Sequence, residues 1–287
     1  MAEATPLPHP LSRSPRPLRR GAALLPSLFT VANLGMGWYA IQQTILAVHS
    51  ANPAAPLDNA AKAIGWAILL DGFDGRIARM VNAASDFGRE FDSLADVISF
   101  GVAPAMLAYT WGSSFVSLGP VPGLYLTRAA HFISFLFLIA GAARLARFNI
   151  VSSDFKPTNP GRAGKRYFVG MPIPGAAGVV AAVVHFFTSP ALGIGLPITV
   201  WEPAVVWLAL VLLLSYCMVS TWRFYSFKDI DLRRRHPFVV TVMLAALLAG
   251  LWLFSEVVLL VLALSYLGFA VAWRASHHLR KAHAARI

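Results

Sequence analysis

Eight apolar stretches separated by short polar segments dominate this chain and limit the folds available to it. A helix that crosses a lipid bilayer needs about 20 mostly apolar residues, and eight segments meet or approach that length. They are residues 22–48, 60–80, 92–113, 124–147, 170–189, 202–222, 237–254 and 256–274. Only 13% of the 287 residues are charged, against about 25% in a typical soluble domain. The sequence therefore predicts an all-α integral membrane protein with eight transmembrane helices.

The chain is expected to form one membrane domain, because no gap between apolar stretches is long enough for a soluble domain. This domain would cover residues 21–275, with a core over about 22–222 and an extra helical hairpin over about 237–274. Residues 1–20 are rich in proline and arginine and are expected to be a disordered cytosolic tail. Residues 276–287 would form a second basic cytosolic tail.

The basic residues indicate how the helices are oriented. If the N-terminus is cytosolic, eight crossings place the C-terminus and the connections after the second, fourth and sixth helices on the same side. Of the 24 Lys and Arg residues, all but Lys62 and Arg128 then lie toward the cytosol, as the positive-inside rule requires. The net charge of +11 would form a rim that faces anionic lipid headgroups, which argues against a nucleic-acid partner.

Four aspartates, Asp71, Asp74, Asp92 and Asp96, interrupt the second and third apolar stretches. The first two are three residues apart and the last two are four apart, so each pair shares one helical face. A short connection between antiparallel helices would bring the two faces together at the cytosolic interface. Carboxylates at membrane depth are costly unless they are compensated, so the cluster needs cations. Oxygen ligands favour Mg²⁺ or Mn²⁺ over zinc, and four carboxylates can hold two such ions.

The residues between the two aspartate pairs suit a ligand that carries phosphate. Gly75 and Ala78 lie on or beside the face of the first pair, where small side chains let a nucleotide approach the helix backbone. Arg79 offers a forked donor for phosphate oxygens. Gly88 opens the entrance to the third helix in the same way. The pattern therefore favours phosphoryl chemistry over a purely structural acidic cluster.

Together these residues resemble the signature of the CDP-alcohol phosphotransferase family at all eight of its defined positions. The matching pattern is Asp71-x2-Asp74-Gly75-x2-Ala78-Arg79-x8-Gly88-x3-Asp92-x3-Asp96. The resemblance implies a six-helix core that binds a CDP-linked lipid such as CDP-diacylglycerol, together with two divalent cations, Mg²⁺ or Mn²⁺. It also implies a homodimer in a bacterial inner (plasma) membrane, with the active site on the cytosolic side.

The same resemblance implies a role for each matching residue. The metal ligands would be Asp71, Asp74, Asp92 and Asp96. The CDP pocket would be formed by Asn33, Asp74, Gly75, Ala78, Arg79 and Gly88. Asp96 would be the catalytic residue and would take the proton from the acceptor alcohol as that alcohol attacks the lipid-bearing phosphorus and CMP leaves. For Asn33, in the first helix, a hydrogen bond between helices is an alternative to nucleotide contact.

Further stretches resemble integral-membrane (type II) phosphatidylserine synthases and narrow the acceptor alcohol. They are residues 25–33, 91–96, 99–104, 143–149, 170–174 and 218–221. L-Serine carries a carboxylate, which needs a cation near the metals. Arg144 and Arg147 are three apart on one face at the cytosolic end of the fourth helix and would bind it, with Asn149 nearby. We therefore expect transfer of the phosphatidyl group from CDP-diacylglycerol to L-serine.

Three alternatives stay open on the sequence alone. Glycerol 3-phosphate or inositol phosphate would use the same arginines, so phosphatidylglycerophosphate or phosphatidylinositol-phosphate synthesis competes with the serine reaction. A divalent-cation transporter also places carboxylates inside helices, but its site should lie near the bilayer midplane, often within inverted repeats, and the sequence holds no second copy of the acidic motif. A prenyl-transfer enzyme would need a repeated aspartate-rich motif, which is also absent.

Overall fold

The computed structural model describes residues 24–81, 86–154, 168–192, 198–220, 223–224 and 237–284, and these residues are almost entirely helical. The α-helices are α1 (Leu24–His49), α2 (Ala54–Val81), α3 (Asp86–Asp96), α4 (Ala103–Ser113), α5 (Pro120–Asp154), α6 (Ile173–Thr188), α7 (Trp201–Val219), α8 (Pro237–Leu253) and α9 (Ser255–Ala284). A π-helical segment, η1 (Val97–Val102), joins α3 to α4, and a 3₁₀ turn, η2, covers Pro190–Leu192. Two short strands, β1 (Phe168–Val169) and β2 (Arg223–Phe224), pair antiparallel.

The observed helices correspond to the eight apolar stretches of the sequence, because α3, η1 and α4 follow one another without a break. Several helices are longer than predicted. α2 begins at Ala54, α5 extends over Pro120–Asp154, and α9 continues to Ala284, into the segment expected to be a tail. Hydropathy detects only the apolar part of a helix, whereas backbone hydrogen bonding continues into polar residues at its ends.

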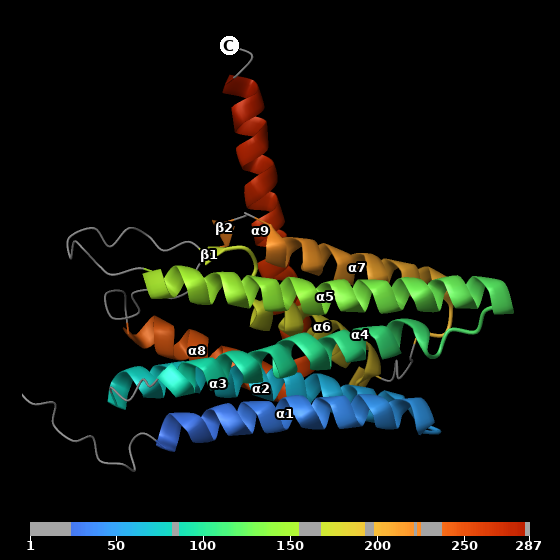
Figure 1. The fold of residues 1–287 in the computed structure, drawn as a ribbon, viewed down its shortest axis with the longest axis horizontal. Helices are drawn as coiled ribbons and strands as arrows, with labels where there is room; N and C mark the ends of the chain where they lie inside the picture. The colour runs from blue at the N-terminus through green and yellow to red at the C-terminus, as the bar shows by residue number, and fades with distance from the viewer. Residues whose placement is uncertain are drawn as a thin grey trace, which may run out of the picture.

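Three helices in the described part of the chain are long and apolar enough to cross a membrane. They are Phe87–Ser113, Val121–Ile150 and Trp201–Val219, and two shorter apolar helices cover Ile173–Thr188 and Ser255–Phe269. Figure 1 shows α1, the α3–α4 rod, α5 and α7 lying roughly along one direction, while the C-terminal part of α9 rises away from them. The chain is therefore an all-helical membrane protein. That all eight stretches span the bilayer remains a prediction.

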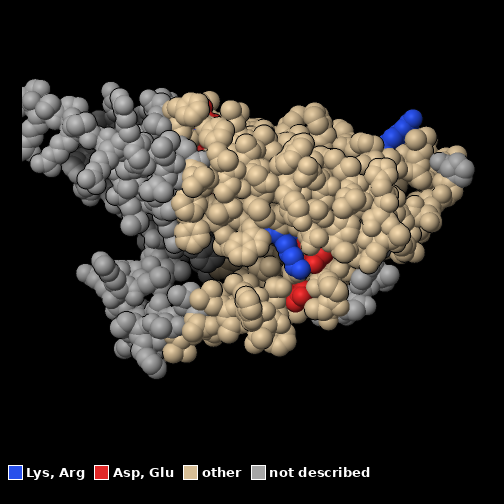
Figure 2. All heavy atoms as spheres, turned by 90° about the horizontal axis from the view of Figure 1, so that it is seen from below, with Lys and Arg blue, Asp and Glu red and all other residues tan. Residues whose placement is uncertain are grey.

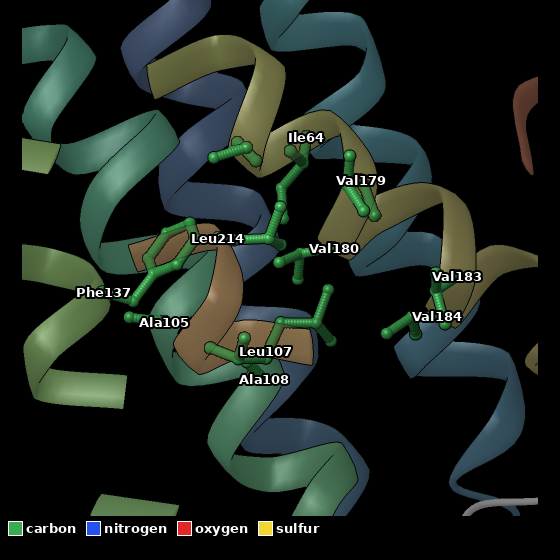
Figure 3. Close-up of a cluster of buried hydrophobic side chains, with 14 of the residues drawn as sticks. Ile64, Ala105, Leu107, Ala108, Phe137, Val179, Val180, Val183, Val184 and Leu214 are labelled. Atoms are coloured by element: carbon green, nitrogen blue, oxygen red, sulfur yellow. The ribbon is translucent and has the colours of Figure 1, made fainter. Parts of the chain in front are cut away.

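The helices share one hydrophobic core, to which α1 and α9 also contribute. Figure 3 shows side chains from α2, α4, α5, α6 and α7 pointing toward one another. They include Ile64, Leu107, Phe137, Val180 and Leu214, all of them buried. Many other core positions are alanines, and small residues let helix backbones approach closely in a membrane protein. The core therefore holds the helices that carry the aspartates at short separation.

The outer surface is apolar as well. Large side chains such as Phe87, Val206, Met243 and Trp252 are exposed, and contiguous exposed apolar surface of this extent is typical of contact with lipid. Figure 2 shows one face of the molecule on which charged side chains are few, with acidic and basic groups side by side at one place. This surface agrees with a membrane environment.

The π-helical segment η1 follows Asp96 directly and has a local cause. Pro104, at the start of α4, has no backbone N–H, and in a regular α-helix its ring would collide with the carbonyl four residues earlier. The backbone hydrogen bonds therefore change from the α-helical to the π-helical pattern, and the Ala103 N–H donates to the Ile98 carbonyl five residues back. Single π turns occur frequently at functional sites.

A buried polar network lies at the opposite end of α2 from the aspartate motif. Asp58 accepts a hydrogen bond from His185 and forms an ion pair with Lys62 at 2.7 Å. Burial raises the pKa of Asp58, but the hydrogen bonds from His185 and Lys62 outweigh that effect and the pKa lies below its ordinary value. The other ring nitrogen of His185 lies 3.0 Å from Ser255 Oγ. The network thus joins α2, α6 and α9.

The contact between α1 and η1 requires a glycine. A Cβ atom added at Gly37 would lie 2.7 Å from Ser99 Cα, whereas one added at Gly35 would meet nothing within 4 Å. We expect Gly37→Ala to cost about 1–3 kcal/mol because backbone atoms must move apart. Gly35→Ala should be neutral or slightly stabilising, since alanine favours the helix. Thermal unfolding of the two variants in detergent measures the difference, and equal midpoints would contradict this packing.

Candidate active site

Three of the four predicted metal ligands lie together where α2 and α3 meet. One carboxylate oxygen from each of Asp71, Asp92 and Asp96 lies within 4.8 Å of the others. Asp96 is buried, and the other two side chains are half-buried. Two negative charges at that separation repel by about 3–4 kcal/mol at an effective dielectric constant of 20. An oxygen-only set that requires positive charge fits a hard divalent cation such as Mg²⁺ or Mn²⁺.

The remaining motif residues are placed only in part. Asp74, Gly75, Ala78 and Arg79 lie in the C-terminal part of α2, and their side chains are outside the described residues. Gly88 lies in the first turn of α3 and is half-buried. The backbone therefore puts Gly88 on the same helix as the second aspartate pair. The nucleotide contacts assigned to these positions stay predictions.

Asn33 reaches Asp96 from α1. Its side chain is fully buried, and its Nδ2 donates to Asp96 Oδ1 at 3.4 Å. The backbone carbonyl of Asn33 accepts a hydrogen bond of 3.0 Å from Ser99 Oγ, which fixes α1 against the segment after Asp96. Asn33 Oδ1 is buried and has no hydrogen-bond partner among the described residues. A buried acceptor left unpaired is unfavourable, so this oxygen is suited to receive a hydrogen bond from a ligand.

The three residues predicted to bind the acceptor lie in different environments, although all are on α5. Arg144 is half-buried and interacts electrostatically with Asp96. Arg147 is exposed, so the two arginines do not act as one buried pair. Asn149 Nδ2 donates to Ser93 Oγ at 2.8 Å and thereby connects α5 to α3. Of the three, Arg144 lies within electrostatic range of Asp96, and Asn149 is hydrogen-bonded to the residue that follows Asp92.

Two residues near the site were missed by the sequence reasoning. Ser93 follows Asp92 directly and receives the hydrogen bond from Asn149. Tyr266, on α9, is half-buried and packs against the core, within electrostatic range of Arg144. In the sequence, Tyr266 is a residue with a polar hydroxyl among the apolar positions of α9 that pack against the core. That pattern does not indicate which residue of another helix will lie near it.

A partly buried carboxylate cluster in an apolar helical bundle is typical of a membrane enzyme that handles phosphate groups with divalent cations. A family model described as CDP-alcohol phosphatidyltransferase matches residues 23–201, which contain the entire aspartate motif. The chain belongs to this family and is a transferase. The cation-transporter and prenyl-transfer alternatives have no support from these comparisons.

Curated relatives carry a more specific name. The chain is 34% identical over 214 residues to the CDP-diacylglycerol–serine O-phosphatidyltransferase of Helicobacter pylori (strain ATCC 700392 / 26695), covering 72% of this chain and 74% of that protein. It is 36% identical over 204 residues to the enzyme of that name from Bacillus subtilis (strain 168), covering 71% and 91%. The match to the Mycobacterium leprae (strain TN) enzyme of that name is 31% identical over 271 residues and covers 91% of this chain. That last match extends past residue 201, into the C-terminal helices.

The cluster predicts cation binding that can be measured without substrate. Saturating Mn²⁺ should raise the unfolding midpoint of the detergent-solubilised protein, since a ligand at 100 times its Kd stabilises by about 2.7 kcal/mol. Asp71→Asn and Asp92→Asn should each remove most of this stabilisation. Glu90→Gln is the matched control, because Glu90 is exposed on α3 two residues before Asp92. Equal Mn²⁺ stabilisation in all four proteins would refute the metal site.

Proposed function

We propose that this protein transfers the phosphatidyl group of CDP-diacylglycerol to L-serine and releases CMP, in phospholipid biosynthesis. The observation that carries the proposal is the cluster of Asp71, Asp92 and Asp96 in a chain whose curated relatives bear the name of that reaction. Arg144, which is half-buried and within electrostatic range of Asp96, supports an acceptor with a negative charge. Glycerol 3-phosphate and inositol phosphate remain the competing acceptors.

The four motif aspartates, Asp71, Asp74, Asp92 and Asp96, would hold two divalent cations, Mg²⁺ or Mn²⁺. Such cations neutralise the pyrophosphate and stabilise the departing CMP. The CDP moiety would lie against Asn33, Asp74, Gly75, Ala78, Arg79 and Gly88. The buried, unpaired Oδ1 of Asn33 supports a contact with a hydrogen-bond donor of the nucleotide.

The reaction forms a bond between the serine hydroxyl oxygen and the phosphorus that carries diacylglycerol. The bond from that phosphorus to the oxygen bridging to CMP breaks, and CMP leaves with the electron pair. Asp96 accepts the proton of the serine hydroxyl. Its burial and the hydrogen bond from Asn33 restrict the orientation of its carboxylate. Because a metal-bound carboxylate is a weak base, positioning and charge neutralisation contribute more than proton transfer.

Within this scheme Arg144 binds the serine carboxylate and Arg147, which is exposed, contributes to the approach of the anionic acceptor. Asn149 supports the site through its hydrogen bond to Ser93. The basic rim predicted from the sequence would place the active site and both termini on the cytosolic side of a bacterial inner membrane, against anionic lipids. The protein would act as a homodimer.

The proposal predicts the outcome of an acceptor screen. Purified protein with CDP-diacylglycerol and Mg²⁺ or Mn²⁺ should release CMP fastest with L-serine, compared with glycerol 3-phosphate and inositol phosphate. Asp96→Asn should lower the rate by about 10²-fold or more, since general acid–base catalysis contributes about 10²–10⁴. Glu90→Gln should retain the wild-type rate.

Each failure of the screen has a separate meaning. If CMP appears only with glycerol 3-phosphate or inositol phosphate, the family chemistry stands and the serine assignment is wrong. If Asp96→Asn keeps full activity with serine, Asp96 is not the base. If no acceptor yields CMP under conditions where Mn²⁺ stabilises the fold, the cluster binds cations without performing this transfer.

A further inference from the structure

Helix α3 carries two of the three clustered aspartates, yet little of it is buried. Among its described side chains only Ala95 and Asp96, in the last turn, are buried, while Phe87 and Leu94 are exposed. Burial of apolar surface therefore fixes the C-terminal end of α3. Asp92, one turn earlier, is half-buried, so its position depends on other contacts.

Electrostatic repulsion acts on the same turn of α3. One carboxylate oxygen from each of Asp92 and Asp96 lies within 4.8 Å of one from Asp71 on α2. Repulsion between these charges favours a rotation of α3 that separates them. A binding site whose ligands are already in place loses less free energy in ordering them when the ion arrives. The contacts that hold α3 therefore influence the affinity for the cation.

The neighbouring helix α5 is firmly anchored. Phe137 and Ala140 belong to the hydrophobic core, and Leu145 is buried as well. Asn149 follows Leu145 by four residues, so the two share one helical face, and Asn149 is half-buried. Asn149 thus extends from the packed face of a helix whose position does not depend on the carboxylates.

Two contacts connect this face of α5 with the segment that runs from α3 into η1, beside which α5 lies (Figure 1). A Cβ atom added at Gly101 of η1 would lie 3.0 Å from Leu138 Cδ1, so η1 and α5 pack closely there. About three turns further along α5, Asn149 Nδ2 donates to Ser93 Oγ at 2.8 Å. The first contact fixes η1 against α5, and the second restricts the rotation of α3.

Ser93 directly follows Asp92, so the two side chains point about 100° apart around α3. A rotation of α3 that turns Asp92 away from α2 also moves Ser93 relative to Asn149. The hydrogen bond therefore resists the motion that the carboxylate repulsion favours. From α1, the hydrogen bond of Asn33 to Asp96 restricts the same helix one turn further on.

We propose that Asn149 and Ser93 are positioning residues of the cation site: their hydrogen bond holds α3 in the rotation that directs Asp92 and Asp96 toward Asp71. Asn149 then acts on the cations through α3, and not on the acceptor alcohol by direct contact. This inference deepens the proposed function, because it rests on the cation site of that reaction, and it holds for any acceptor.

Binding of Mn²⁺ to the detergent-solubilised full chain, measured by isothermal titration calorimetry, tests this role. Residues that support metal ligands typically change metal affinity by about 10–100-fold. Because this support is transmitted through one turn of helix, we expect Ser93→Ala and Asn149→Ala each to raise the Kd for Mn²⁺ about tenfold, at the lower end of that range. The double variant should bind no more weakly than either single one, since both substitutions remove the same hydrogen bond.

Two further variants serve as controls. Ser93→Thr keeps a hydroxyl that can accept from Asn149 and should retain most of the wild-type affinity. Ser134→Ala removes another hydroxyl, which lies on α5 and donates to the His131 carbonyl, and should leave the Kd for Mn²⁺ unchanged. A cooperative unfolding transition without metal confirms that each variant is folded. If Asn149→Ala does not fold, Ser93→Ala decides, because it removes a single oxygen atom.

Kinetics distinguish positioning from direct contact with the acceptor. For both alanine variants, the Mn²⁺ concentration that gives half-maximal CMP release should rise about tenfold. At saturating Mn²⁺, KM for serine should stay close to the wild-type value. A raised KM for serine in Asn149→Ala at saturating Mn²⁺, with an unchanged Kd for Mn²⁺, would show that Asn149 contacts the acceptor and would overturn the proposal.

The results separate this inference from the proposed function. If the wild type binds Mn²⁺ and the alanine variants bind it equally well, or if their effects are additive, only the role of this hydrogen bond is wrong. If serine yields no CMP while both variants still weaken Mn²⁺ binding, the serine assignment fails and the positioning role stands. If the wild type does not bind Mn²⁺, the cation site fails and the inference fails with it.

Discussion

The repulsion among Asp71, Asp92 and Asp96 is the constraint on which the rest of the site depends. Three carboxylates with oxygens within 4.8 Å of one another are stable in an apolar bundle only when positive charge compensates them. The protein supplies part of this charge through Arg144, which interacts with Asp96. Oxygen ligands crowded in this way suit divalent cations, whose charge would relieve the repulsion. In the proposed reaction the same cations would hold the pyrophosphate of the donor.

Close packing converts this electrostatic requirement into a defined geometry. α1 approaches η1 at Gly37, where Ser99 takes the place of a side chain and donates to the Asn33 carbonyl. Asn33 in turn donates to Asp96. The position of the proposed base is thus set by a helix that contributes no carboxylate. A hydrogen bond from a neutral amide can orient Asp96 without adding charge, which leaves the balance between carboxylates and cations unchanged.

The sequence predicted the parts of the site that depend on local periodicity. Spacings of three and four residues put each aspartate pair on one helical face, and the structure brings Asp71 together with Asp92 and Asp96. The sequence left two roles open for Asn33, nucleotide contact and a hydrogen bond between helices, and did not identify Asp96 as its partner. It also did not predict the hydrogen bond between Asp58 and His185. These contacts depend on the relative rotation and shift of helices far apart in the chain. No local sequence pattern specifies how two distant helices are rotated and shifted relative to each other. The π-helical segment that follows Asp96 also departs from the regular spacing on which such patterns depend.

The same reasoning applies to α9, which lies outside the matched core. Its first residue, Ser255, lies 3.0 Å from His185 of α6, and His185 is hydrogen-bonded to Asp58 of α2. These contacts help to determine which side of α9 meets the core. In the proposed reaction the carboxylate cluster would treat every cation-bound pyrophosphate alike, so discrimination between acceptors would have to come from groups that meet the acceptor's own charge.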